Sequence, residues 1–304
     1  MQIHNSHEKL LNLYLILKKT KNWTSILLFR AGLIKTCRII FKDNDYLDVG
    51  NHKLNWVVFL MIIRLKHNLD KFELEYINRN NLIITITKNS IKFLVNDITI
   101  RDTLIVIEEQ FVQDLYRVKN FSLVGQTVVD VGANIGDSSI LFASKGAKVF
   151  AFEPVPSTYA NLVENIKVNN YSSMIYPYNV GLSDRNEEIT VRINLYNSLS
   201  FSLSKNEFNI NTNAEKIKLV ETIGFLRQNN IIKCDILKID CEGCEYVLLR
   251  DPSLLHYLNP TIVMIEYHAG NMDHLVDILK TFFAEVEVVP SRNHNQCGII
   301  YAKC

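Results

Sequence analysis

The pattern of apolar and polar residues predicts an α/β domain in the second part of the chain. From residue 127 onward, short β-branched runs alternate with longer segments in which apolar residues recur every three or four positions. Thr158–Val168 is one predicted helix, with Ser157 as its expected N-cap. Its Leu162, Val163 and Ile166 lie on one side. Strands and helices that alternate in this way form a mostly parallel sheet covered by helices on both faces.

Seven strands are predicted in this domain. They are Thr127–Val131, Lys148–Phe152, Ile175–Asn179, Asp235–Ile239, Thr261–Ile265, Glu285–Val289 and Gly298–Ala302. The last two strands are joined by residues 290–297, a connection too short for a helical crossover, so we expect them to pair antiparallel. The sequence therefore predicts a doubly covered parallel sheet that is closed by one antiparallel strand.

Residues 1–120 have a different pattern, and we expect them to form an extension to the α/β domain at 121–304. Met1–Leu69 is rich in Leu, Ile and Lys and predicts two or three helices. Short β-branched runs then predict a small antiparallel sheet with strands at 83–87, 91–95 and 104–107, followed by a short helix at 108–116.

Composition and charge narrow the range of partners. The chain has 304 residues, of which 48% are hydrophobic and 21% charged, so it can bury a large core. Its net charge of +1 gives no reason to expect a nucleic-acid partner. Residues 1–42, however, contain eight Lys and Arg and only one acidic residue, Glu8. This segment suggests an alternative function as a membrane-surface or partner-docking protein, although we favour packing of these helices onto their own domain.

Localisation follows from the absence of export signals. The N-terminus does not resemble a secretory signal, and the strongest apolar run, Trp56–Ile63, is much shorter than the roughly 20 residues of a membrane helix. We therefore expect a cytoplasmic protein without a transmembrane segment, in which peripheral membrane contact stays open. The six cysteines are expected to be reduced, with Cys241 and Cys244 as small apolar fillers rather than a zinc or redox pair.

The first predicted strand runs into a ligand-binding turn, Asp130-Val131-Gly132-Ala133-Asn134-Ile135-Gly136. Gly132 allows the backbone to approach a ligand, and Gly136 allows the next helix to begin close to the strand. Asp130 is expected to bind a cationic or polar group of the ligand. Because position 134 is Asn, the turn lacks the middle glycine of dinucleotide-binding turns and suits an amino-acid ligand better than a pyrophosphate. We expect Asn134 to be one of the cofactor-binding residues of this turn.

The next two strands end in further candidate cofactor residues. Glu153, followed by Pro154, can accept hydrogen bonds from both hydroxyls of a ribose. Asn179 can contact the edge of an adenine, but it can equally be an ordinary loop residue.

Acidic residues and a histidine follow the fourth and fifth predicted strands. Asp240 and Glu242 end the fourth strand, and Glu266 and His268 end the fifth. These positions lie beside the cofactor, where an acceptor has to be held. We expect Asp240, Glu242 and His268 to be catalytic, with His268 able to remove a proton from an acceptor hydroxyl. Whether a metal takes part is open: Asp240 and Glu266 together could hold a divalent cation, which we do not predict.

These motifs resemble the FkbM-type family of S-adenosylmethionine-dependent methyltransferases. The matching stretches lie between Thr127 and His268 and include Ala151-Phe152-Glu153-Pro154 and Leu237-Lys238-Ile239-Asp240-Cys241-Glu242-Gly243-Cys244-Glu245. The resemblance implies a Rossmann-like class I fold, S-adenosyl-L-methionine as cofactor, and O-methylation of a sugar, glycan or other hydroxylated acceptor. It also implies cofactor roles for Asp130, Gly132, Gly136 and Glu153.

The sequence departs from the family's pattern at two places. Thr222-Ile223-Gly224 replaces a common Thr-Leu-Asp, so a family carboxylate is missing, and Cys241 and Cys244 replace small aliphatic residues. A nicotinamide dehydrogenase, the other reading of such a fold, is disfavoured by the missing middle glycine and by the antiparallel last strand.

Overall fold

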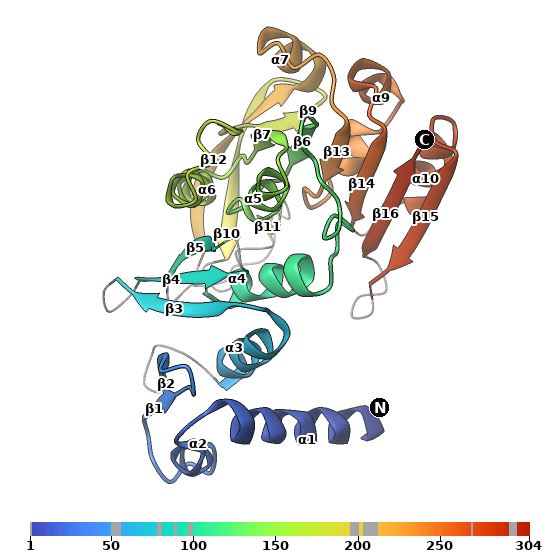
Figure 1. The fold of residues 1–304 in the computed structure, drawn as a ribbon. Helices are drawn as coiled ribbons and strands as arrows, with labels where there is room; N and C mark the ends of the chain where they lie inside the picture. Colours follow the sequence, from blue (N-terminus) through green and yellow to red (C-terminus); the bar gives the residue numbers. More distant parts are fainter. Residues whose placement is uncertain are drawn as a thin grey trace. The chain divides into compact units, whose positions relative to one another are not determined.

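The computed structural model divides the chain into two units, Met1–Leu115 and Tyr116–Cys304, each of which is described by itself. The described residues are 2–49, 56–77, 81–87, 90–96, 100–194, 201–202, 212–268, 270–291 and 297–304. Figure 1 shows the order of the elements along the chain. Among the described residues, no helix combines the length and the apolar character that crossing a bilayer requires.

The second unit is built on the seven-stranded sheet expected from the sequence (Figure 1). Its strands are β6 (Thr127–Val131), β7 (Lys148–Phe152), β8 (Ile175–Tyr178), β13 (Ile236–Ile239), β14 (Ile262–Tyr267), β15 (Glu285–Pro290) and β16 (Gly298–Lys303). Their order is β15-β16-β14-β13-β6-β7-β8. The strand β16 runs antiparallel to both β14 and β15, whereas β6, β7, β8, β13 and β14 are parallel. This confirms the class I methyltransferase arrangement; residues 292–296 of the last connection lie outside the described residues.

Six helices accompany this sheet in the described residues: α5 (Asp137–Ser144), α6 (Pro156–Val168), α7 (Thr222–Gln228), α8 (Glu245–Leu248), α9 (Ser253–Leu258) and α10 (Met272–Lys280). The expectation that Ser157 caps α6 is wrong. The helix begins two residues before the predicted start, at Pro156, whose fixed φ suits the first turn and whose missing N–H needs no partner there. Ser157 instead donates from its amide and its hydroxyl to Glu215, at 2.9 and 2.6 Å.

A second sheet in this unit was not expected from the sequence. It consists of β9 (Gly181–Ser183), β10 (Glu187–Asn194), β11 (Phe201–Ser202) and β12 (Thr212–Glu221), in the order β11-β10-β12-β9. Val191 of β10 and Ile217 of β12 form a small core with Val155, which follows the end of β7. The sheet is thereby held beside the carboxyl ends of the parallel strands.

The first unit contains the three helices expected before residue 69: α1 (Gln2–Lys19), α2 (Trp23–Arg30) and α3 (Trp56–Asn68). It also contains a hairpin of β1 (Cys37–Ile40) and β2 (Tyr46–Val49) and a sheet of β3 (Phe72–Tyr76), β4 (Asn81–Ile86) and β5 (Ile91–Asn96), followed by α4 (Ile100–Ile107) and the π-helix η1 (Glu108–Val112).

The small antiparallel sheet is confirmed, but its third strand was assigned to the wrong segment. Residues 104–107 belong to α4, where Ile100, Leu104 and Ile107 are buried at the spacing of one helical face. The third strand is β3, which pairs with β4. The helix predicted at 108–116 is the shorter η1.

Candidate active site

The turn after β6 is organised around the fully buried carboxylate of Asp130. Its Oδ2 accepts hydrogen bonds of 2.6 Å from the hydroxyls of Ser138 and Ser139, at the start of α5. Its Oδ1 lies 3.0 Å from the ammonium nitrogen of Lys238. Both carboxylate oxygens therefore contact polar groups of the chain itself, and the contact between Asp130 and a ligand stays a prediction.

Glycine is needed at two positions of the turn for reasons of packing. Gly132 has φ +77°, and a Cβ there would lie 1.7 Å from the carbonyl oxygen of Asp240. Gly136 has φ +92°, and a Cβ there would lie 2.6 Å from Leu162 of α6. The sequence suggested that Gly132 makes room for a ligand, but its first neighbour is the backbone that follows β13. Asn134 adopts a positive φ of 47° without being glycine.

Glu153 lies at the end of β7 and points back toward this turn. Its two carboxylate oxygens accept from the backbone amides of Asn134, at 3.0 Å, and Val155, at 2.8 Å. Burial raises the pKa of Glu153 to about 7, although both hydrogen bonds lower it. Asn179 donates its side-chain amide to the carbonyl oxygens of Glu153 and Pro154, at 2.9 and 3.1 Å, and so fixes the chain after β7.

The predicted catalytic residues meet at the ends of β13 and β14. The Nε2 atom of His268 lies 3.7 Å from Glu242 Oε2 and 4.0 Å from Asp240 Oδ1. Glu266 Oε1 lies 3.9 Å from the same nitrogen. All four side chains are partly exposed, and Glu242 holds a positive φ of 55°. Strained backbone at a group of converging polar side chains is typical of a functional site.

The surrounding carboxylates decide the protonation of His268. Burial lowers its pKa, but its contact with Glu245 and the negative charges of Glu242 and Asp240 outweigh this and raise the pKa to about 9. Burial also raises the pKa of Glu242, although the charge of His268 opposes the shift. The surrounding carboxylates thus favour the protonated form of His268, and its role in removing the acceptor's proton stays a prediction.

Two buried residues of the acidic segment 237–245, Lys238 and Glu245, were noted in the sequence without an assigned role, and their contacts connect the two parts of the site. Lys238 of β13 lies 3.0 Å from Asp130 Oδ1 and 3.7 Å from Asp240 Oδ2, and it donates to the carbonyl oxygen of Gly132 at 2.7 Å. Glu245 is completely buried and accepts from the amides of Gly243, at 2.8 Å, and His268, at 3.0 Å. Lys238 thus joins the two strand ends, and Glu245 ties the loop after β13 to the end of β14.

A disulfide bond joins Cys241 and Cys244 in that loop. The expectation of two reduced cysteines at these positions is therefore wrong. Their side chains come together because the turn through Glu242 and Gly243, both at positive φ, reverses the chain between them. Cys37, Cys234, Cys297 and Cys304 lie outside this disulfide.

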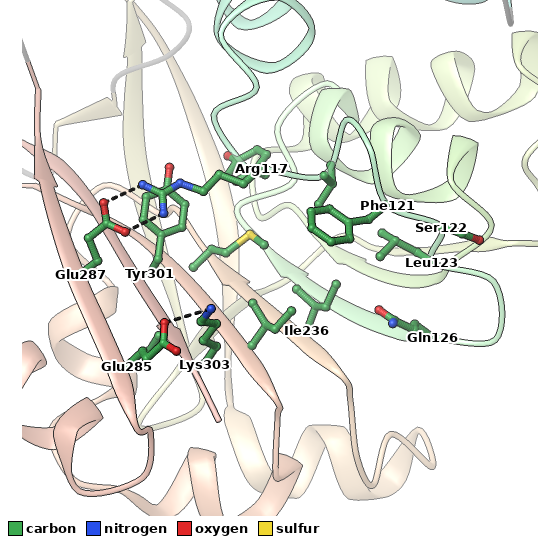
Figure 2. Close-up of a pocket in the computed structure, with 15 residues that line it drawn as sticks. Arg117, Phe121, Ser122, Leu123, Gln126, Ile236, Glu285, Glu287, Tyr301 and Lys303 are labelled. Atoms are coloured by element: carbon green, nitrogen blue, oxygen red, sulfur yellow. Dashed lines mark hydrogen bonds and ion pairs between the residues drawn. The ribbon is translucent and has the colours of Figure 1, made fainter.

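Two clefts occur at opposite edges of the main sheet. One, of about 350 Å³, lies at the carboxyl edge, between Gly132, Pro154, Glu242 and the second sheet. The other, of about 330 Å³, lies at the amino edge, where Ile236 and Ile262 begin their strands; Figure 2 shows that it is flanked by the ion pairs Arg117–Glu287 and Lys303–Glu285. The predicted site residues gather at the first edge, so the candidate active site is there.

A divalent cation is a further possibility at the acidic group. One ligand atom each from Asp240, Glu266 and His268 lies within 4.8 Å of the others. Two carboxylates and an imidazole are suitable ligands for several divalent metals. The Lys238 ammonium beside Asp240 already supplies one positive charge to this group, which disfavours a second.

Comparison with known proteins assigns the fold to a family. The sequence profile of the methyltransferase FkbM domain matches residues 130–292, more than half of the chain. Hexuronic acid methyltransferase AglP of Haloferax volcanii is 29% identical over 143 residues, which cover 46% of this chain and 55% of that protein. AMB antimetabolite synthetase AmbE of Pseudomonas aeruginosa is 35% identical over 96 residues, which cover 31% of this chain and 4% of that protein. The chain thus spans about half of AglP and a small part of AmbE.

Solved methyltransferases show a looser likeness. Methyltransferase FkbM from Methylobacillus flagellatus aligns over 68% of this chain and 55% of its own, at 15% identity and a TM-score of 0.41. The magnesium protoporphyrin IX methyltransferase of Synechocystis aligns over 67% and 83%, at 14% identity and a TM-score of 0.38. The assignment depends on the profile match, which includes every site residue from Asp130 to His268. The chain belongs to the FkbM methyltransferase family.

Proposed function

We propose that the protein transfers the methyl group of S-adenosylmethionine to a hydroxyl oxygen of a sugar or a similar hydroxylated acceptor. The observation that carries this proposal is the convergence of two groups at one sheet edge: the turn with Glu153 after β6 and β7, and Asp240, Glu242 and His268 after β13 and β14. A glycan acceptor is supported by AglP, whose name states a hexuronic acid as its substrate.

The residues after β6 and β7 suit the cofactor. Each oxygen of Glu153 accepts one backbone amide and keeps a second lone pair, so the carboxylate can still accept from two ribose hydroxyls. Such donors would stabilise the ionised form, which burial otherwise disfavours. The adjoining cleft of about 350 Å³, bordered by Gly132 and Pro154, falls in the usual size range of ligand pockets. When bound, adenosylmethionine supplies an electrophilic methyl group.

The residues after β13 and β14 can handle the acceptor's proton. We assign Glu242 as the base, because burial raises its pKa toward neutrality and its carboxylate is partly exposed. His268, as a cation, can stabilise negative charge that develops on the acceptor oxygen. Asp240 lies between the cations of Lys238 and His268, where it can accept a hydrogen bond that orients the acceptor hydroxyl.

Two measurements test this function. Calorimetry with S-adenosylhomocysteine and NAD should show binding of the first in preference to the second. Incubation with tritiated adenosylmethionine and a panel of glycans, including uronic acids and their reduced neutral forms, should then label an oxygen of one class of acceptor. Preference for NAD would refute the cofactor proposal. Labelling of nitrogen or carbon acceptors, with no labelling of hydroxyls, would refute the O-methyl proposal alone.

A further inference from the structure

The helix α1 in the first unit exposes an unusual number of apolar side chains. Leu10, Leu13, Tyr14 and Leu17 are all exposed and follow the i, i+3, i+4, i+7 spacing of one helical face. We call these four residues the exposed stripe. An apolar stripe with this spacing normally faces a core, so its exposure points to an interaction surface.

The opposite face of α1 is already used inside the first unit. Leu15 and Ile16 are buried, and α1 packs against α3. Asn12 accepts from Arg64 of α3 at 3.1 and 3.2 Å, and Lys19 donates to the carbonyl oxygen of Lys66 at 2.9 Å. The exposed stripe is therefore additional to the face that holds α1 in place.

The segment that follows also carries exposed apolar side chains. Those of α2 and the turn after it are Trp23, Leu27, Leu28 and Leu33. With the exposed stripe, they have exposed fractions between 37% and 71%. They include a tryptophan, a residue that favours the boundary between lipid and water.

The charges of this segment indicate which kind of partner it can bind. Residues 9–42 carry eight Lys and Arg and no acidic residue, and Lys9, Lys18, Lys21, Arg30, Lys35, Arg38 and Lys42 are exposed. A second copy of the chain would place this positive charge against an identical positive surface, which is unfavourable. An anionic bilayer matches both properties: its headgroups attract the basic side chains, and its interface accepts the apolar ones.

We propose that α1 and α2 dock the protein on an anionic membrane surface, with the exposed stripe and Trp23 inserted at the headgroup boundary. This inference is independent of the methyl acceptor. It concerns peripheral binding by the first unit, and none of the residues placed in the candidate active site takes part in it.

The chain offers a direct reporter of this insertion. It has two tryptophans, Trp23 and Trp56, so the variant Trp56→Phe leaves Trp23 as the single fluorophore. Vesicles of 70% phosphatidylcholine and 30% phosphatidylglycerol should shift the Trp23 emission to the blue. Pure phosphatidylcholine vesicles should do so much less, and added salt should weaken the effect because it screens the basic residues.

Paired variants distinguish binding through this surface from non-specific hydrophobic adsorption to vesicles. Leu10→Ser with Leu17→Ser should weaken partitioning to the anionic vesicles at least tenfold, equivalent to about 1.4 kcal/mol. The matched control, Val124→Ser with Ile232→Ser, removes two apolar side chains of the second unit that are even more exposed than Leu10 and Leu17, and it should change partitioning less than twofold. Lys9→Gln with Lys18→Gln should reduce the preference for anionic lipid, unlike Lys216→Gln with Lys233→Gln. Circular dichroism should confirm that all variants stay folded.

Three results would overturn the proposal: no binding of the wild-type chain to anionic vesicles, equal loss of binding in the Leu variant and its control, or a dimer in sedimentation that the Leu variant dissociates while vesicle binding is absent.

Discussion

The two sides of the candidate active site differ in how their polar groups are satisfied. After β6 and β7, Asp130 and Glu153 are buried, and each carboxylate is held by short contacts of 2.6–3.0 Å within the chain. After β13 and β14, Asp240, Glu242 and His268 are partly exposed, and the distances between their charged atoms are 3.7–4.0 Å. The carboxylates of the first side are fixed by the chain itself, and only the second lone pair of each Glu153 oxygen is left for a ligand. The charged groups of the second side are held less tightly.

This difference fits a division of labour between an invariant and a variable ligand. A cofactor is the same in every turnover, so a preorganised site binds it without the cost of rearrangement. In the proposed O-methylation, the acceptor has to be bound, deprotonated and released in each turnover. The longer contacts among Asp240, Glu242 and His268 permit these changes. The two sides nevertheless share Lys238, whose ammonium lies 3.0 Å from Asp130 and 3.7 Å from Asp240.

The largest effect is expected from removing that shared charge. Lys238→Met should leave the buried carboxylate of Asp130 without its cation and lower the free energy of unfolding by about 3–5 kcal/mol. Urea denaturation measures this. Lys167→Met, which removes an exposed Lys from α6, should change the same quantity by less than about 0.5 kcal/mol. Equal stabilities of the two variants would show that the cofactor side does not depend on buried charge.

The comparison predicts that substitutions after β13 and β14 affect chemistry and not cofactor binding. Asp240→Asn, Glu242→Gln and His268→Ala should each slow methyl transfer by about 100-fold or more, with the affinity for S-adenosylhomocysteine nearly unchanged. Single-turnover rates and calorimetry measure the two quantities. Glu164→Gln on α6 is a suitable control because its side chain is half exposed. Wild-type rates in all three variants would refute the catalytic assignment of these residues but not the assignment of the fold.

Substitutions on the other side should have the opposite effect. Glu153→Ala removes a charged acceptor and should weaken cofactor binding by roughly 1–3 kcal/mol, measured by calorimetry with S-adenosylhomocysteine. Glu188→Ala, at an exposed position of β10, should bind normally. If Glu153→Ala bound as tightly as the control, the ribose role would be wrong and the buried carboxylate would serve only to hold the amides of Asn134 and Val155.

The stability of the protein should depend on pH through His268. Its pKa is about 9 in the folded protein and about 6.5 when unfolded, so the native state binds more protons between these values. The contribution of His268 to the free energy of unfolding is therefore complete below about pH 6.5 and is lost as the pH rises through 9. We expect the free energy of unfolding to fall by roughly 1–2 kcal/mol over this range, and denaturation curves of His268→Gln should lack this decrease. An unchanged decrease in the variant would assign it to another group.

The smallest effect is expected from metal removal. Because Lys238 already places a cation beside Asp240, we expect treatment with EDTA to change the rate of methyl transfer less than twofold. A large loss that magnesium or manganese restores, together with protection of the metal-loaded protein against unfolding, would instead assign Asp240, Glu266 and His268 as metal ligands.

The main sheet was predictable from the sequence, but the smaller sheets were only partly so. In the main sheet, β-branched runs alternate with helices of clear period, and the short last connection fixes the antiparallel strand. Residues 104–107 were misassigned because a run of four apolar residues fits a strand and a helix equally well. The pairing of β10 with β12 depends on contacts between segments separated by a long connection, which local pattern does not reveal.

The site was predictable in position and less so in the roles of its residues. Motifs at strand ends placed Asp130, Glu153 and Asp240 at one edge, because the carboxyl ends of parallel strands meet there. The contacts of Lys238 were not foreseen, since its partners depend on strand neighbours. A signal was present nonetheless: a Lys within the otherwise apolar strand Ile236–Ile239 has to be paired with buried acids.

The contact between Gly132 and the backbone at Asp240 has a consequence for how this enzyme can diversify. Because a Cβ added at position 132 would collide with the carbonyl oxygen of Asp240, any other residue there would force the two loops apart. Evolution toward a new acceptor is therefore confined to changes that leave this junction in place: side-chain exchange beyond Asp240, or altered segments elsewhere in the chain. An engineer should therefore keep this glycine, Glu242 and the length of both loops, and randomise residues of the second sheet that line the same cleft, such as Ile189 and Ile217.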